Sequence, residues 1–307
     1  MLSPIDEIIS ELGNPDKPLL NAWLTELGNL SSEDLESFKQ AWPNIDLERR
    51  RQIVSQLVEL TEDNFELDFD NIFKSFLDDQ DTEVRSKAIE GLWENEETSL
   101  ISTLLNLFEH DGSAKVQAAA ATALGRFIML AEHQKLHSSY TPKIYQALIT
   151  TINDQGKPVE VKRRALEAVA PVCSTEVKKA ISEAYYSGQA ELKVSSVYAM
   201  GKNCSPSWLP ILLKELASAD AEIRYEAAGA CGEIGNEEAV PHLIELTQDP
   251  DIEVQLQAIR ALGKIGGTEA KNQLEQCLDD DNELIQQAAE QALYELNEGE
   301  EPLSFSI

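Results

Sequence analysis

Small and apolar residues recur in this chain at helical spacing, and the pattern repeats every 31 residues from position 160 onward. Each copy is counted from a first residue, the anchor; the anchors are Glu160, Glu191, Glu222, Glu253 and Leu284. In the first copy, the residues one, five, eight and nine positions after the anchor are Val161, Ala165, Ala168 and Val169, and later copies keep small or apolar residues there. These positions share one stripe of a 3.6-residue helix, so the pattern predicts a helix with one buried face in every copy.

Glycine and proline indicate a second helix in each copy. Ten residues after their anchors stand Gly201, Gly232 and Gly263. Gly235 and Gly266 stand three residues further on, where glycine favours a helix end and a reversal of the chain. Pro210 and Pro241 then fit the first turn of a following helix. Each copy therefore predicts a helix pair, and its small residues allow neighbouring helices to approach closely.

Weaker copies of the pattern extend towards the N-terminus. They begin at Lys115, at Glu83 and near Glu48. The step from position 115 to position 160 is 45 residues instead of 31, which indicates an insertion near 129–143, either a longer loop or an extended helix. We therefore expect repeats over residues 46–297.

The two ends of the chain do not fit the repeat. Residues 1–45 are expected to form a helical cap, in which Ser3 caps one helix and Ser31 begins a capping box before another. Such a cap would cover the first repeat of a stack, as stacked repeats require. Residues 298–307 are acidic at first and are expected to form a flexible tail.

The segment from Asp249 to Gly266, DPDIEVQLQAIRALGKIG, resembles the short HEAT-like repeats of the phycobilisome lyase type. The signatures of tetratricopeptide and ankyrin repeats are absent from the sequence. The resemblance implies an all-α fold, an α–α superhelix of the armadillo-like HEAT-repeat solenoid class. It also implies an inner concave wall made by the second helix of each pair. Its commonest use is to bind another protein, so the resemblance implies a scaffold or adaptor.

The charge balance restricts the kind of partner. Lys and Arg number 25 against 55 Asp and Glu, which gives a formal net charge of −30. Such a chain is a poor binder of nucleic acid or of an anionic membrane. No apolar run is long enough to cross a bilayer, and the N-terminus lacks the parts of a signal peptide, so we expect a cytoplasmic location. We expect a protein partner with a basic or neutral surface, although the same charge also serves solubility.

Catalytic chemistry has little support in the sequence. The four cysteines, Cys173, Cys204, Cys231 and Cys277, have no C-x-x-C spacing and are interpreted as reduced core residues. Deoxyhypusine hydroxylases resemble this chain but hold iron with His–Glu pairs, and no His–Glu dipeptide occurs here. A HEAT-like DNA glycosylase uses a basic face, whereas this chain is acidic. We therefore expect no enzyme, metal or cofactor. A bilin-lyase-type enzyme subunit acting on a chromophore or protein side chain is the alternative, because such subunits lack a simple motif.

Candidate binding residues lie three and seven positions after the anchors, away from the predicted buried stripe. They differ from copy to copy, as a surface fitted to one irregular partner would. The candidates on the concave face are Arg163, Glu167, Val194, Tyr198, Tyr225, Leu256 and Arg260. We expect the four uncharged residues to form an exposed apolar patch flanked by the two arginines. The alternative is that these residues pack against neighbouring helices within the superhelix.

Overall fold

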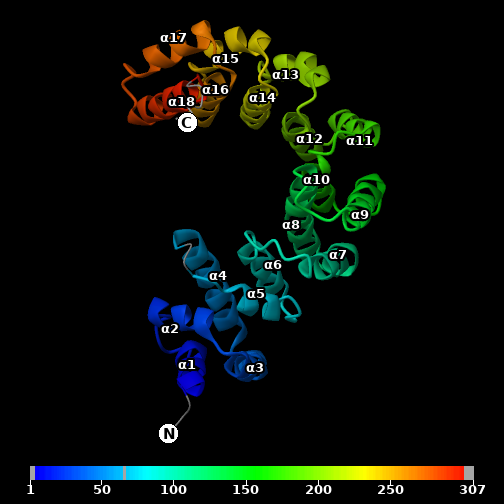
Figure 1. The fold of residues 1–307 in the computed structure, drawn as a ribbon, viewed down its shortest axis with the longest axis vertical. Coiled ribbons are helices and arrows are strands. Elements are labelled where there is room, and N and C mark those ends of the chain that lie inside the picture. The colour runs from blue at the N-terminus through cyan, green and yellow to red at the C-terminus, as the bar shows by residue number, and fades with distance from the viewer. Residues whose placement is uncertain (1–3, 65–66, 301–307) are drawn as a thin grey trace, which may run out of the picture. The chain divides into compact units, whose positions relative to one another are not determined.

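The computed structural model describes residues 4–64 and 67–300, and these residues form helices joined by short loops, without a strand (Figure 1). The chain divides into two compact parts, unit 1 (Met1–Ala147) and unit 2 (Leu148–Ile307). In both units most helices come in pairs. The second helix of each pair packs on the second helix of the next pair, which makes a row of second helices in each unit.

Unit 1 begins with three helices and continues with a row of pairs. The first three are α1 (Pro4–Gly13), α2 (Asn21–Thr25) and α3 (Ser32–Ala41), with short 3-10 helices at Glu26–Asn29 and Trp42–Asn44. The others are α4 (Leu47–Asp63), α5 (Asp70–Phe76), α6 (Thr82–Gly91), α7 (Leu100–His110) and α8 (Ala114–Glu132). α5 pairs with α6 and α7 with α8, while α4, α6 and α8 form the row of second helices.

An aromatic cluster holds α3 against α5 in unit 1. Phe38, Trp42 and Phe76 are all buried. The rings of Trp42 and Phe76 are stacked with centroids 4.0 Å apart, and Phe38 lies 5.6 Å from Trp42. Large rings contribute much buried apolar area each, so this cluster compensates for the shortness of the helices that carry it.

The predicted insertion is partly helical. α8 continues for 19 residues, to Glu132, and a loop over 133–140 connects it to α9 (Thr141–Asn153), which spans the boundary between the units. An extended helix is one of the two forms that the spacing of the repeats allowed.

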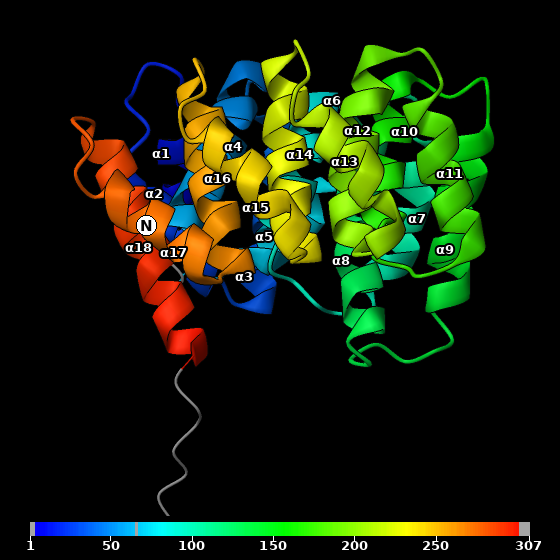
Figure 2. The same ribbon diagram turned by 90° about the horizontal axis from the view of Figure 1, so that it is seen from above.

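The described part of unit 2, up to residue 300, contains five second helices in one row. The helices are α10 (Val159–Val169), α11 (Thr175–Tyr185), α12 (Ala190–Asn203), α13 (Leu209–Glu215), α14 (Ala221–Ile234), α15 (Val240–Leu246), α16 (Ile252–Ile265), α17 (Thr268–Cys277) and α18 (Glu283–Glu300). Each of α10, α12, α14 and α16 packs on the next even-numbered helix. Within unit 2 this row lies on the inner side of the curve, and Figure 2 shows its helices side by side.

The predicted buried stripe is present in unit 2. All residues one, five and eight positions after an anchor have exposed fractions of 7% or less. Position nine is also buried in α10, α12, α14 and α16 but only partly in α18, at Leu293. Among the described helices α18 is the last of the row, so one second helix packs on it, whereas two pack on each of α12, α14 and α16.

Left-handed residues end two of the second helices where the repeat predicts a turn. Gly235 ends α14 with φ 69°, and Cys204 takes the equivalent place after α12 with φ 50°. Cys231 and Cys277 are buried as predicted, but Cys173 and Cys204 are exposed, so the prediction of four core cysteines is wrong for these two. Cys204 lies outside the helix as a cap residue, which turns it away from the buried stripe.

The ends of the described chain agree in part with the sequence. Ser31 caps α3, because its hydroxyl accepts a hydrogen bond from the Asp34 backbone N–H at 3.2 Å. α18 continues to Glu300, into the range 298–307 that was expected to form a flexible tail. The rest of that tail and Ser3 lie outside the described residues. The division into a cap and a series of repeats stays a prediction.

Candidate functional site

The predicted site residues lie on the row of second helices in unit 2. From α10, Arg163 Nε donates to the Ser195 hydroxyl of α12 at 2.9 Å, and that hydroxyl donates to Glu167 Oε1 at 2.6 Å. Arg164 forms an ion pair with Glu167 at 2.8 Å. Arg163 and Glu167 stand three and seven positions after one anchor, and both contact Ser195, which stands four positions after the next anchor. Arg163 and Glu167 belong to a polar network between two helices.

Val194 and Leu256 are buried, with exposed fractions of 6% and 7%, so the prediction of an exposed apolar patch is wrong for both. They occupy the same position as Arg163, three residues after an anchor, beside the neighbouring second helix. The long side chain of Arg163 reaches a polar partner on that helix, whereas an aliphatic side chain remains between the helices. Packing within the solenoid, the alternative interpretation, holds for these two residues.

Tyr198, Tyr225 and Arg260 remain accessible. The exposed fraction of Tyr198 is 36%, and Lys202 Nζ lies 5.6 Å from the centre of its ring. Tyr225 is half-buried on α14. Arg260 of α16 is exposed and donates a long hydrogen bond to Gln257 Oε1 at 3.4 Å. The accessible surface is therefore aromatic and charged instead of aliphatic.

Glu226 of α14 was missed by the sequence analysis. Glu226 stands four positions after its anchor, as Ser195 does, and its negative charge acts on Tyr198. Burial raises the pKa of Glu226 to about 7, with the negative charges of Glu167 and Glu222 acting in the same direction. Within the part of the chain that the structure describes, its half-buried carboxylate has no hydrogen bond and no ion pair.

Another carboxylate on the same row is directly paired. Glu233 of α14 forms ion pairs with Lys202 at 3.2 Å and with Lys264 at 2.9 Å. Burial acts to raise the pKa of Glu233, but the hydrogen bond from Lys264 and the charge of Lys202 lower it overall. Glu233 is paired with cations and Glu226 is not. The sequence alone does not show which of the two carboxylates a cation reaches.

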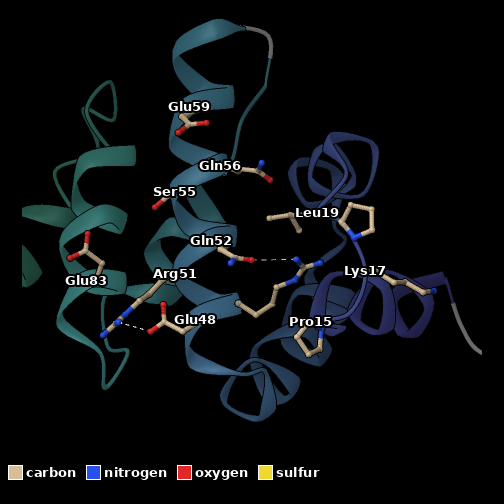
Figure 3. A pocket seen from close by; sticks show the side chains of 12 residues that line it. Pro15, Lys17, Leu19, Glu48, Arg51, Gln52, Ser55, Gln56, Glu59 and Glu83 are labelled. Carbon is tan, nitrogen blue, oxygen red and sulfur yellow. Dashed lines mark hydrogen bonds and ion pairs between the residues drawn. The ribbon is translucent and has the colours of Figure 1, made fainter.

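A groove of about 670 Å³ in unit 1 is a second candidate site (Figure 3). One wall is α4 from Glu48 to Glu59, and the other is the segment 15–19, which contributes Pro15 and Leu19. Glu83 of α6 lies at one end of the groove. Sequence reasoning missed this groove because its lining comes from the expected cap and from the faintest copy of the repeat.

Arg49 is one of the residues that line this groove and is 4% exposed. Its Nε donates to the Leu12 carbonyl at the end of α1 at 2.6 Å, and its Nη1 donates to Gln52 Oε1 at 3.4 Å, drawn dashed in Figure 3. Its Nη2 and Gln56 Oε1 are buried without a partner among the described residues. Arg49 joins α4 to α1, so its role is to hold the wall of the groove.

The paired helices define an α-solenoid, and the repeat that builds it is identified by comparison. The family model for HEAT repeats matches residues 70–154 and 209–294, which together make up more than half of the chain. The chain belongs to the HEAT repeat family. No curated protein matches the sequence.

Solved structures share the fold. The complex of CpcE and CpcF of phycocyanin lyase from Nostoc sp. is 17% identical over 93% of this chain and 96% of the matched chain, with a TM-score of 0.55. A structure of Kap95p bound to RanGDP is 16% identical over 96% of this chain and 45% of the matched chain, also with a TM-score of 0.55. Human deoxyhypusine hydroxylase is 18% identical over 96% of both chains with a TM-score of 0.34. At these identities the first two similarities show the fold alone.

Within residues 4–64 and 67–300, no three or more His, Cys, Asp or Glu side chains gather in a way that suits a metal ion. Over the same residues, no helix is both long enough and apolar enough to span a membrane.

Proposed function

We propose that this protein is a non-enzymatic scaffold or adaptor that holds a protein partner on the row of second helices of unit 2. The proposed surface consists of Arg163, Glu167, Tyr198, Tyr225, Glu226 and Arg260. The observation that carries the proposal is the accessible ring of Tyr198 next to the unpaired carboxylate of Glu226. A partner would cover the ring and give the carboxylate a hydrogen-bonding group, and aromatic residues are enriched in the cores of protein interfaces.

Two solved structures support a protein partner by analogy of fold. CpcE is found in a complex with CpcF, and Kap95p in a complex with RanGDP. The acidic composition of this chain favours a partner with a basic or neutral surface.

A photo-crosslinking amino acid placed at position 198 tests the surface. We would replace Tyr198 with p-benzoylphenylalanine, irradiate native cells that express the variant, and identify covalent adducts by mass spectrometry. The matched control carries the same substitution at Tyr186, which is 71% exposed and caps α11, the first helix of the pair α11–α12. We expect a protein adduct from position 198 and none of the same mass from position 186.

Adducts that form equally from both positions would show contact without preference for the second helices and would overturn the proposal. A lack of any adduct from position 198 would do the same. The alternative, a bilin-lyase-type enzyme subunit, is tested on the protein purified from its native cell. Visible absorption from a bound pigment would contradict a plain scaffold.

A further inference from the structure

The carboxylate of Glu226 is surrounded by cations that are already engaged elsewhere. Lys202 and Arg163 are the positive groups whose charges act on it. Lys202 is held by Glu233 at 3.2 Å, and Arg163 by Glu160 at 3.1 Å and by the Ser195 hydroxyl. Neither forms an ion pair with Glu226 within the described chain.

Negative charge prevails around Glu226 when every neighbouring helix is considered. The charges acting on it from α10, α12 and its own helix are, in order of effect, Glu167, Glu222, Lys202 and Arg163. α16 packs on α14 and carries Arg260, which is exposed and contacts Gln257 on its own helix. α13 also packs on α14 and carries Lys214 and Glu215, of which Glu215 is paired with Lys193 at 2.8 Å. The two negative charges act on Glu226 more strongly than the two positive ones, and no cation among the described residues pairs with its carboxylate.

The aromatic neighbour adds a second element of recognition. Burial raises the pKa of Tyr198, and the negative charge of nearby Glu226 acts in the same direction. Its ring already has the ammonium group of Lys202 5.6 Å from its centre, so it accommodates a cation. A long basic side chain has both parts that this site can use, a charged head for a carboxylate and an apolar stem for a ring.

We infer that the partner presents a lysine or arginine side chain that forms an ion pair with Glu226 and lies against the ring of Tyr198. This inference rests on the proposed function, because it names the chemistry of the partner on the same surface. The occupant is a basic segment of a protein, and the net charge of −30 favours its approach.

Titration of the Glu226 carboxylate tests the inference with a defined probe. The probe is a peptide of four Lys-Gly units, and the control peptide has Gln in place of Lys. We would label the glutamate carboxyl carbons with ¹³C and assign the Glu226 signal from E226Q. The Lys peptide is expected to move the Glu226 signal and lower its pKa by about one unit, as an adjacent positive charge does. The Gln peptide should leave this pKa unchanged.

Glu222, exposed one turn earlier on α14, is the internal control for non-specific attraction to an acidic protein. An equal effect of the Lys peptide on Glu222 and Glu226, or no effect on Glu226, would overturn the inference. E226Q removes an unpaired half-buried charge, so above pH 7 we expect it to be at least as stable as the wild type, and misfolding would not confuse the result.

The protein captured through position 198 provides a second probe. We expect E226Q to bind it about tenfold more weakly and E222Q within about twofold of the wild type. Glu226 is charged above its pKa of about 7 and neutral below it, so wild-type affinity should fall up to about tenfold from pH 8 to pH 6. E226Q should show no such fall. A partner that binds E226Q as tightly as the wild type would overturn this inference and leave the scaffold proposal standing, whereas failure to capture any protein would overturn both.

Discussion

Gly201, Gly232 and Gly263 occupy the same position in three successive second helices and face an alanine of the next helix. A Cβ atom added at Gly201 would lie 2.7 Å from the Cα atom of Ala230, a contact with backbone that no side-chain rotation relieves. Alanine favours a helix over glycine by about 1 kcal/mol, but overpacking costs about 1–3 kcal/mol. We therefore expect Gly201→Ala to lower the free energy of unfolding by about 1 kcal/mol, measured by urea denaturation.

Gly229 of α14 is the matched control for this substitution, because it also lies in a second helix and faces the next one. A Cβ atom added there would meet Gln257 Nε2 at 2.5 Å, the far end of a flexible side chain that can rotate away. Gly229→Ala should thus be neutral or stabilising by up to about 1 kcal/mol. Equal stability of the two variants would show that close approach of the helices does not depend on the glycine.

In both units an ion pair joins a second helix to the loop before the next second helix. We name this ion pair the Arg–Asp clasp. Arg224 of α14 donates to both carboxylate oxygens of Asp249 at 2.7 and 2.8 Å, and Arg85 of α6 does the same to Asp111 at 2.9 Å. Both arginines stand two residues after an anchor. Each aspartate also accepts a backbone N–H two residues later, so the clasp holds the loop that precedes the next second helix.

Asp249→Asn should destabilise the protein and change its pH dependence. Burial acts to raise the pKa of Asp249, but the hydrogen bonds from Arg224 and the Asp251 backbone lower it overall. A lowered pKa in the folded state stabilises the protein above the unfolded pKa of about 4, and this contribution is lost as the pH falls through the folded pKa. We expect a loss of about 3 kcal/mol at pH 7, measured by urea denaturation, and a smaller difference from the wild type at pH 3.

Asp280→Asn is the control for the turn itself. Asp280 stands one repeat after Asp249 and accepts the Asn282 backbone N–H at 2.9 Å, but no cation among the described residues pairs with its carboxylate. This variant should differ little from the wild type at either pH. A loss equal to that of Asp249→Asn would assign the effect to the turn and not to the ion pair.

The same contrast explains what the sequence could predict. Packing repeats every 31 residues, so the buried stripe and the helix pairs follow from the spacing of Ala and Gly. The exposure of Val194 and Leu256 was predicted wrongly. It depends on how the neighbouring helix covers them, and the spacing of residues along one helix does not show this. The importance of Glu226 and Arg49 was not predicted because it depends on which partners each charge lacks, and those residues come from other helices.

In the molecule as a whole, repulsion among the excess negative charges destabilises the folded state, whereas the ion pairs stabilise it. The net charge of −30 favours the expanded chain, in which the charges are further apart. Salt screens this repulsion, and it also weakens exposed ion pairs, but the clasp side chains are largely buried and are screened less. We therefore expect the thermal midpoint at pH 7 to rise by several degrees when NaCl increases from about 0.01 to 0.3 M.

Screening of the repulsion raises the thermal midpoint, and weakening of the exposed ion pairs lowers it. The direction of the salt effect therefore shows which of the two contributions is larger. The control is the same experiment near the isoelectric point of about 4.4, where net repulsion vanishes and NaCl should no longer stabilise the protein. A midpoint that falls with salt at pH 7 would mean that exposed pairs such as Lys264–Glu233 contribute more than the repulsion costs. A rise at pH 7 that disappears near pH 4.4 would instead show that the excess negative charge reduces stability. A function that needs this charge, such as attracting a basic partner, would account for its presence.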